Sequence, residues 1–246
     1  MKKSFLMVAA AAAMLIATGF TACKPNSTPK EVDVYVAGFD NSGAKSIAKV
    51  WKNGKELYDL TDGTKSAEAR SVFVVGGDVY TAGYENNGTK DVAKLWKNKS
   101  ATDLTDGSKY AKALSVFVAG SNIYTAGYEI KGMKYVAKVW KNKKAIFNTN
   151  GSKGASARSV FVAGEDVYAT GGEGGVAKVW KNKEELYELA DNGDGKSIVV
   201  HNGDVYVAGY ETEGSNRVAK VWKNGKELYS LADDGGAYSI FIAERK

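Results

Sequence analysis

Five tryptophans mark five copies of one repeat in this chain. Each stands in the string Ala-Lys-(Val/Leu)-Trp-Lys-Asn, and neighbouring copies are separated by 45, 44, 40 and 42 residues. The tryptophans are Trp51, Trp96, Trp140, Trp180 and Trp222. A full copy has Ser-Val-Phe-Val, a short turn, Val-Tyr-x-Ala-Gly-Tyr-Glu, a loop, the tryptophan string and an apolar stretch ending near Asp-Gly. A period of about 40–45 residues with four short strands is typical of β-propeller blades.

The strands of a repeat, here named a to d, follow from runs of β-branched and aromatic residues bounded by Gly, Asn and Asp. In the second copy, strand a is expected at Ser71–Val75, strand b at Val79–Tyr84 and strand c at Val92–Trp96. Between strands c and d, Asn53-Gly54 is a strong hairpin signal, and the Asn-Lys turns of other copies suit the positive φ that Asn tolerates. The strands of each repeat are therefore predicted to pair antiparallel.

The first copy, beginning at Asp33, lacks strand a, whereas Ser239–Ile242 near the end of the chain matches it. An open array would leave unpaired strand edges, which proteins avoid. We therefore predict an all-β, five-bladed β-propeller over residues 31–246. Pairing of its N- and C-terminal strands would close the ring, with residues 238–243 completing blade 1. This architecture resembles the five-bladed tachylectin-2 lectin family and, more loosely, the WD40 class, although the Gly-His and Trp-Asp pairs of WD40 repeats are absent. A likeness of fold does not transmit activity.

Residues 1–22 have the layout of a secretory signal, with Lys2 and Lys3 before the apolar stretch 5–16. An uncleaved transmembrane anchor is the alternative. Cys23, the only cysteine, follows two small residues, and this arrangement resembles the bacterial lipoprotein processing site. The resemblance implies a lipid-modified Cys23, a tether over 23–30, and the outer membrane as location, with the leaflet open.

The net charge of +6 comes from interspersed acidic and basic residues. Such a mild bias permits contact with an anionic surface and does not demand nucleic acid. We expect no nucleic-acid partner, a membrane contact through the lipid anchor, and a monomer.

The position just before strand a is the one repeated position that changes chemistry, and in propellers it opens onto the central channel. The residues at this position are Arg70, Leu114, Arg158, Lys196 and Tyr238. Leu114 is apolar, and the other four are the predicted ligand contacts. The tyrosines that end strand b are further candidates, namely Tyr84, Tyr128 and Tyr210. The fourth repeat has Gly172 in place of this tyrosine and a short loop, which predicts a missing or altered site there. Variation at a solvated edge is the alternative explanation.

Three other repeated features have structural explanations. The tryptophans are expected to pack between blades. The lysines around the c–d turns are expected to protect solvated edges, with docking on anionic lipid as the alternative. The acid that ends strand b should pair with the lysine of strand c across the hairpin. The acids are Asp40, Glu85, Glu129, Glu173 and Glu211, and the lysines are Lys49, Lys94, Lys138, Lys178 and Lys220.

Catalysis has little support in the sequence. His201 is the only histidine and occupies a turn position, so neither a histidine triad nor a His/Cys metal cluster can form. Strand a, as predicted, carries no carboxylate. We expect a non-enzymatic binding module for a glycan or protein, without cofactor or metal. The alternatives are a carbohydrate-active hydrolase or lyase using loop carboxylates, and a purely structural envelope lipoprotein. The carboxylates in question are Glu68, Asp191, Asp194 and Asp233.

Overall fold

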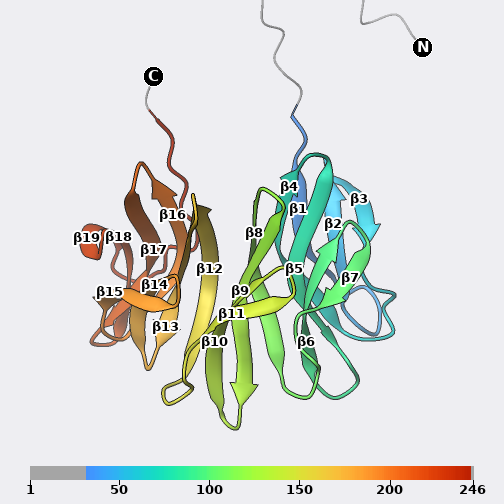
Figure 1. Cartoon of the computed structure of the whole chain (residues 1–246), viewed down its shortest axis with the longest axis horizontal. Coiled ribbons are helices and arrows are strands. Elements are labelled where there is room, and N and C mark those ends of the chain that lie inside the picture. The colour runs from blue at the N-terminus through green and yellow to red at the C-terminus, as the bar shows by residue number, and fades with distance from the viewer. Residues whose placement is uncertain (1–31, 245–246) are drawn as a thin grey trace, which may run out of the picture. The chain divides into compact units, whose positions relative to one another are not determined.

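The computed structural model describes residues 32–244, and its regular structure is nineteen strands in five antiparallel sheets (Figure 1). From Val34 onward the chain forms one compact unit. The predicted signal (1–22), the lipidated Cys23 and the tether (23–30) lie outside the described residues. The described residues form no helix that could span a bilayer.

The sheets follow the repeats, and within each sheet the strands are adjacent in chain order. Sheet 1 consists of β1 (Tyr35–Asp40), β2 (Ile47–Lys52) and β3 (Lys55–Asp59). Sheet 2 consists of β4 (Ala67–Val75), β5 (Asp78–Asn86), β6 (Asp91–Lys97) and β7 (Ser100–Asp103). Sheet 3 consists of β8 (Ala111–Ala119), β9 (Asn122–Lys131), β10 (Lys134–Lys141) and β11 (Lys144–Asn148). Sheet 4 consists of β12 (Ala155–Ala163), β13 (Asp166–Glu173), β14 (Val176–Lys181) and β15 (Glu184–Ala190). Sheet 5 consists of β16 (Gly193–His201), β17 (Asp204–Glu213), β18 (Asn216–Lys223) and β19 (Lys226–Ala232).

Strand a is longer than the sequence predicted. In sheet 2 it begins at Ala67 and not at Ser71, because the ladder with β5 continues past an irregularity at residue 70. That irregularity breaks the alternation of buried and exposed residues by which strands are recognised. The extension adds carboxylates to two strands, at Glu68 in β4 and Asp194 in β16. The prediction that strand a carries no carboxylate was therefore wrong.

The predicted backbone conformation of the c–d turns is confirmed, because the asparagine of every turn has a positive φ. These φ angles are 51° at Asn53, 55° at Asn98, 57° at Asn142, 50° at Asn182 and 50° at Asn224. Each side chain also bonds the start of strand b in its own sheet. In sheet 2, for example, Asn98 Oδ1 accepts a hydrogen bond from the Val79 N–H at 3.0 Å. The turn thus sets the backbone path and holds two neighbouring strands together.

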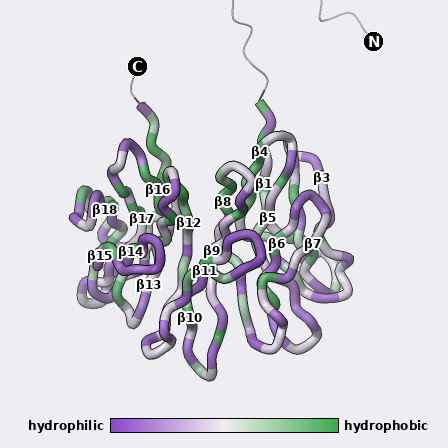
Figure 2. The backbone as a smooth tube through the Cα atoms, in the orientation of Figure 1, coloured by the Kyte–Doolittle hydropathy of each residue, from purple (hydrophilic) through white to green (hydrophobic). Residues whose placement is uncertain are grey.

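Four of the tryptophans pack against the preceding sheet, as predicted. Trp96 joins a core cluster with residues of sheet 1, and Trp140 one with residues of sheet 2. Trp180 packs against sheet 3, with its ring 5.8 Å from Phe147 of β11, and Trp222 packs against sheet 4. Figure 2 shows the hydrophobic residues on the strands and the hydrophilic ones mostly in the turns. Burial of an indole between sheets therefore stabilises each junction.

Strand a of successive sheets forms a second set of contacts. The serine in each accepts a hydrogen bond from a backbone N–H of the next, as Ser71 Oγ does from Val116 at 3.1 Å. The same bond joins Ser115 to Val160 and Ser159 to Ile198. Ser197 Oγ likewise accepts the N–H of Ile240 at 3.3 Å, which lies in the C-terminal segment. The C-terminal segment thus contacts β16 in the way that strand a of the next sheet contacts strand a before it.

The predicted pairing of the two ends is not formed among residues 32–244. There β1 pairs with β2 alone, and residues 235–244 form no strand. In Figure 1 the first and last sheets lie on opposite sides of the view. The two ends expose apolar side chains; Phe241 is 86% exposed, Tyr229 57% and Val36 51%. Trp51 is only partly buried, because no sheet precedes sheet 1 in this structure.

Candidate functional site

The variable position predicted to contact a ligand is a β-bulge in every sheet that has strand a. Opposite strand b, the register shifts between the residues on either side of that position. The extra residues are Arg70, Leu114, Arg158 and Lys196. A bulge twists the strand and re-aims the side chain at that point, and bulges are frequent beside functional sites.

A glycine in strand b makes each bulge possible. A β-carbon at Gly83 would overlap the carbonyl oxygen of Glu68, and one at Gly171 that of Ser156. Gly127 and Gly209 are placed in the same way against Lys112 and Asp194. The Gly-Tyr-Glu string therefore contains glycine because the bulged partner approaches its backbone closely.

One bulge residue, Arg158, lies in a cavity of about 330 Å³ between sheets 3, 4 and 5. The cavity lies at the edge formed by the b–c and d–a connections, here called the loop edge. Its aromatic lining is Tyr128, Tyr135 and Tyr210, and Gly154, Gly172 and Gly193 leave room beside them. The rings of Tyr128 and Tyr135 meet edge to face with centroids 4.8 Å apart. A concave site with aromatic walls and a few polar groups suits a small ligand.

Asp194 is the polar centre of this cavity. Its residue surface is only 7% exposed, and its Oδ2 accepts Lys196 Nζ at 2.6 Å and Arg158 Nε at 3.1 Å. Its Oδ1 is buried and has no hydrogen-bond partner among the described residues. A buried carboxylate oxygen without a partner costs free energy, which a hydrogen-bond donor on a ligand would recover.

Arg158 and Tyr128 add donors to this acceptor. Within residues 32–244, Nε is the only guanidinium nitrogen of Arg158 with a protein partner. Burial raises the pKa of Tyr128, so its hydroxyl remains protonated at neutral pH. The cavity therefore offers one buried acceptor close to several donors.

No family model matches the chain, and no curated protein sequence matches it.

The fourth repeat creates the cavity by departing from the others. Gly172 occupies the register position of Tyr84, Tyr128 and Tyr210, and a β-carbon there would lie 3.3 Å from Asp194 Oδ1. Where the other repeats have tyrosine, the wall of the cavity beside the carboxylate is therefore formed by glycine. The sequence predicted a missing or altered site at this repeat, and the structure has the Asp194 cavity there.

The other predicted contacts lie elsewhere. Arg70 pairs with Glu68, and its guanidinium lies 5.9 Å from the Tyr84 ring, over which Lys112 Nζ sits at 3.7 Å. Tyr238 is 66% exposed in the unpaired C-terminal segment. The structure thus brings together Arg158, Lys196, Tyr128 and Tyr210 around Asp194, and leaves out Arg70, Tyr84 and Tyr238.

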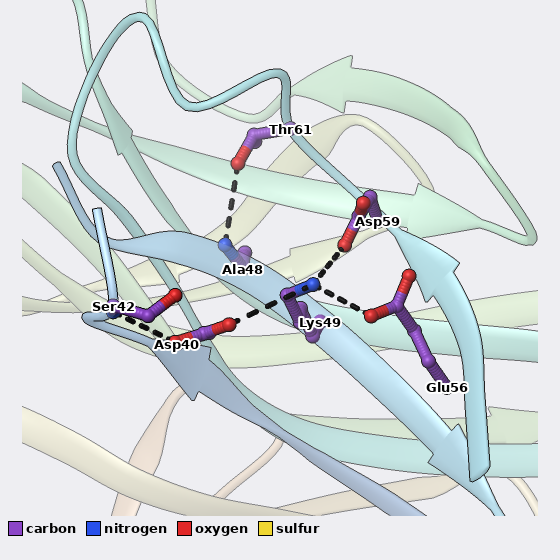
Figure 3. Close-up of polar contacts among 7 residues, drawn as sticks. All are labelled: Asp40, Ser42, Ala48, Lys49, Glu56, Asp59 and Thr61. Atoms are coloured by element: carbon purple, nitrogen blue, oxygen red, sulfur yellow. Dashed lines mark hydrogen bonds and ion pairs between the residues drawn. The ribbon is translucent and has the colours of Figure 1, made fainter. Parts of the chain in front are cut away.

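The predicted ion pair across strands b and c is confirmed in all five sheets. The N–O distances are 3.8 Å for Lys49–Asp40, 3.1 Å for Lys94–Glu85, 3.5 Å for Lys138–Glu129, 3.7 Å for Lys178–Glu173 and 2.6 Å for Lys220–Glu211. In sheet 1, Lys49 also contacts Glu56 and Asp59 of β3 at 2.7 Å each (Figure 3). Hydrogen bonds to Asp59 and Glu56 raise the pKa of Lys49, so it stays charged. Four of these lysines also pair with an acid of strand d and so join three strands, namely Lys49, Lys94, Lys178 and Lys220. All five have a structural role.

Two other hollows have fewer features of a site. One of about 110 Å³ is lined mainly by apolar residues, among them Val139, Phe147 and Trp180. One of about 480 Å³ lies among turn residues that include Gly120 and Lys141. None of the described side chains lining either hollow has a buried polar atom without a partner.

Proposed function

We propose that this protein is a lipid-anchored β-propeller of the cell envelope that binds a glycan at the loop edge, in the cavity around Asp194. One observation carries the proposal: Asp194, whose buried Oδ1 has no hydrogen-bond partner among the described residues, lines a cavity together with three tyrosines. A sugar offers adjacent hydroxyl groups that can donate to Asp194 Oδ1 and accept from Arg158, while its C–H faces pack on tyrosine rings. A protein side chain could use the same groups, and the test below distinguishes the two.

The proposed ring closure is supported by three features of the open ends. In sheets 1 to 4, apolar side chains of the last strand, or of the residue just after it, pack near the tryptophan of the next sheet, as Phe147 does with Trp180. In sheet 5 the equivalent side chains on β19 are exposed, and sheet 1 has Trp51 without a preceding sheet. The two surfaces are therefore complementary: β19 would cover Trp51 in a closed ring.

Gly38 is the second feature. It corresponds to Gly83, Gly127, Gly171 and Gly209, yet a β-carbon there would meet only the Trp51 ring, at 3.1 Å. The other four are held to glycine by the backbone of a bulged strand a. A bulged strand a paired with β1 would approach Gly38 equally closely and would explain why this position is also glycine.

The third feature is the C-terminal segment itself. Gly235 N–H bonds the Arg217 carbonyl at 2.6 Å, as Gly193 N–H at the start of β16 bonds that of Gly175. Residues 235–243 align with β12 (Ala155–Ala163), which predicts their register on β1 by analogy with sheet 4. The predicted partners are Ala237 with Gly38, Ile240 with Val36, and Phe241 with Tyr35.

The proposed outer-membrane location and lipid anchor rest on the lipoprotein-like signal and Cys23. We further propose that the protein is a monomer without enzymatic activity. Hydrolysis by carboxylates alone needs a pair flanking the bond to be cleaved. Asp194 is the only carboxylate among the residues lining the cavity, and it is engaged by two cations.

The decisive test is a glycan array followed by calorimetry on the best ligand. Asp194→Asn and Arg158→Ala should each weaken binding at least tenfold. Arg70→Ala, outside the cavity, and Asp191→Asn, an exposed acid on the neighbouring loop, should bind as the native chain does. Thermal melting shows whether Asp194→Asn remains folded. Absence of any glycan ligand, or equal losses in all four variants, would overturn the proposal. Release of reducing sugar would favour the hydrolase.

A further inference from the structure

We infer that the edge opposite the cavity is a docking surface for an anionic lipid bilayer. This edge, here called the turn edge, is formed by the a–b and c–d turns. The two kinds of turn share one edge because strands b and c are antiparallel; in sheet 2, Tyr80 at the start of β5 lies opposite Lys97 at the end of β6.

The turn edge carries exposed lysines without acidic partners. Three acids there are engaged: Asp78 pairs with Lys97 at 2.8 Å, Asp166 with Lys181 at 2.8 Å, and Asp204 with Lys223 at 2.7 Å. Two others, Glu165 and Glu184, are exposed and have no ion pair among the described residues. Every c–d turn contributes at least one further exposed lysine for which the described residues supply no ion pair. These lysines are Lys55, Lys99, Lys143, Lys144, Lys183 and Lys226. The surplus charge on this edge is therefore positive.

The chain reaches its first strand on the same edge. Val34 N–H donates to Asn53 Oδ1 at 2.8 Å, and the Val34 carbonyl accepts the Asn53 N–H at 2.9 Å, so Val34 sits against the first c–d turn. The Val34 side chain is 56% exposed there. Exposed apolar side chains beside lysines are the combination that binds a bilayer interface containing anionic lipid.

Docking through the turn edge would fix the orientation of the protein on the bilayer. With the turn edge on the bilayer, the loop edge and the Asp194 cavity face away from it. A lysine near an anionic surface is attracted over about one Debye length, so binding must weaken as salt rises. This inference rests on the turn-edge lysines and Val34 of the compact unit, and not on the glycan proposal.

The test uses a chain beginning at Lys24, which keeps the whole compact unit and omits the apolar residues 5–16 that would bind lipid by themselves. It is sedimented with vesicles of phosphatidylcholine containing about one third phosphatidylglycerol, and with phosphatidylcholine alone. We expect partitioning into the anionic vesicles only, reduced at least tenfold when NaCl is raised from about 0.05 to 0.5 M.

A matched pair of triple variants locates the surface. Lys99→Glu, Lys143→Glu and Lys183→Glu change the turn edge and should reduce partitioning at least tenfold. Lys45→Glu, Lys65→Glu and Lys131→Glu make the same change in net charge at the loop edge and should leave partitioning within about twofold. Equal losses in both triple variants, equal binding to neutral vesicles, or no binding at all would overturn the inference. Glycan binding measured on the turn-edge variant separates this outcome from failure of the cavity proposal.

Discussion

A β-carbon on Gly172 would lie 3.3 Å from Asp194 Oδ1, so glycine at residue 172 keeps the wall of the cavity beside the buried carboxylate free of a side chain. We predict that Gly172→Tyr closes the cavity and abolishes glycan binding. Tyrosine already occupies this register position in three other sheets, so the fold should accept it. Calorimetry on the array ligand checks the loss of binding.

Gly154→Ala lines the same cavity with little added volume and serves as the matched control. It should keep affinity within about threefold. Native affinity in Gly172→Tyr, with a melting temperature equal to that of the native chain, would show that the ligand binds elsewhere.

Ring closure predicts that Trp51 contributes more to the free energy of unfolding than it would in the open form. In the open arrangement Trp51 is only partly covered, and Trp51→Ala should cost little. In a closed ring it is buried like Trp140, and removal of a buried tryptophan typically lowers the free energy of unfolding by about 3–5 kcal/mol. We predict a loss for Trp51→Ala within about 1 kcal/mol of that for Trp140→Ala, measured by urea unfolding. A loss for Trp51→Ala below about 1 kcal/mol beside a full loss for Trp140→Ala would exclude closure.

The predicted register of the closing strand is tested with engineered cysteines in the chain beginning at Lys24. Directly opposed residues of an antiparallel pair have Cα atoms about 4.5–5.5 Å apart, within the range of a disulfide. Val36→Cys with Ile240→Cys should form an intramolecular disulfide on oxidation. Val36→Cys with Phe241→Cys places the thiols on opposite faces and should not. Mass spectrometry of the proteolysed monomer detects the link; a link only between chains would indicate exchange of the segment.

Lys220 should show how the buried lysines contribute to stability. Its Nζ lies 2.6 Å from Glu211, 2.7 Å from Glu213 and 3.0 Å from Glu227. Lys220→Met would leave these carboxylates facing one another and should lower the free energy of unfolding by about 2 kcal/mol at pH 7. Lys226→Met, an exposed lysine of the same sheet, should change it by less than about 0.5 kcal/mol.

The effect of Lys220 should depend on pH in a defined way. Burial alone would lower the pKa of Lys220, but its hydrogen bonds to Glu211, Glu213 and Glu227 outweigh burial and raise it. The hydrogen bond from Lys220 lowers the pKa of Glu227. A raised lysine pKa stabilises the fold below the unfolded value of about 10.4, and a lowered glutamate pKa stabilises it above about 4.3. The difference between native and Lys220→Met chains should therefore be largest between about pH 5 and 10. It should shrink as the acids protonate or the lysine loses its proton. A difference independent of pH would argue against the ion cluster.

The c–d turns allow backbone strain to be separated from hydrogen bonding. Asn98 has a φ of 55°, accepts from Val79, and donates to Asp78 Oδ1 at 3.0 Å. Asn98→Gly keeps the turn geometry and loses only the bonds, which should cost about 1 kcal/mol. Asn98→Ala loses both and should cost about 1 kcal/mol more. Equal costs in thermal unfolding would mean that the positive φ carries no penalty there.

Much of the fold could be predicted from the sequence because its signals act over short distances. The Trp-Lys-Asn strings, the alternating apolar residues and the Asn turns identify each hairpin, and the Lys220–Glu211 type of pair is only nine residues apart. The bulges were not visible, because an extra residue at Arg158 breaks the alternation on which strand boundaries depend.

The cavity required the tertiary structure. Its walls come from Tyr128, Gly172 and Tyr210, which are separated by about forty residues each and meet only because neighbouring sheets pack face to face. From the sequence alone, Gly172 indicated a missing tyrosine, and Asp194 was one of the loop carboxylates of the alternative hydrolase or lyase. Local pattern thus determined the repeat, its strands and its hairpin ion pairs. Packing between repeats decided where a side chain is absent, which carboxylate oxygen has no hydrogen-bond partner among the described residues, and therefore where a ligand has room.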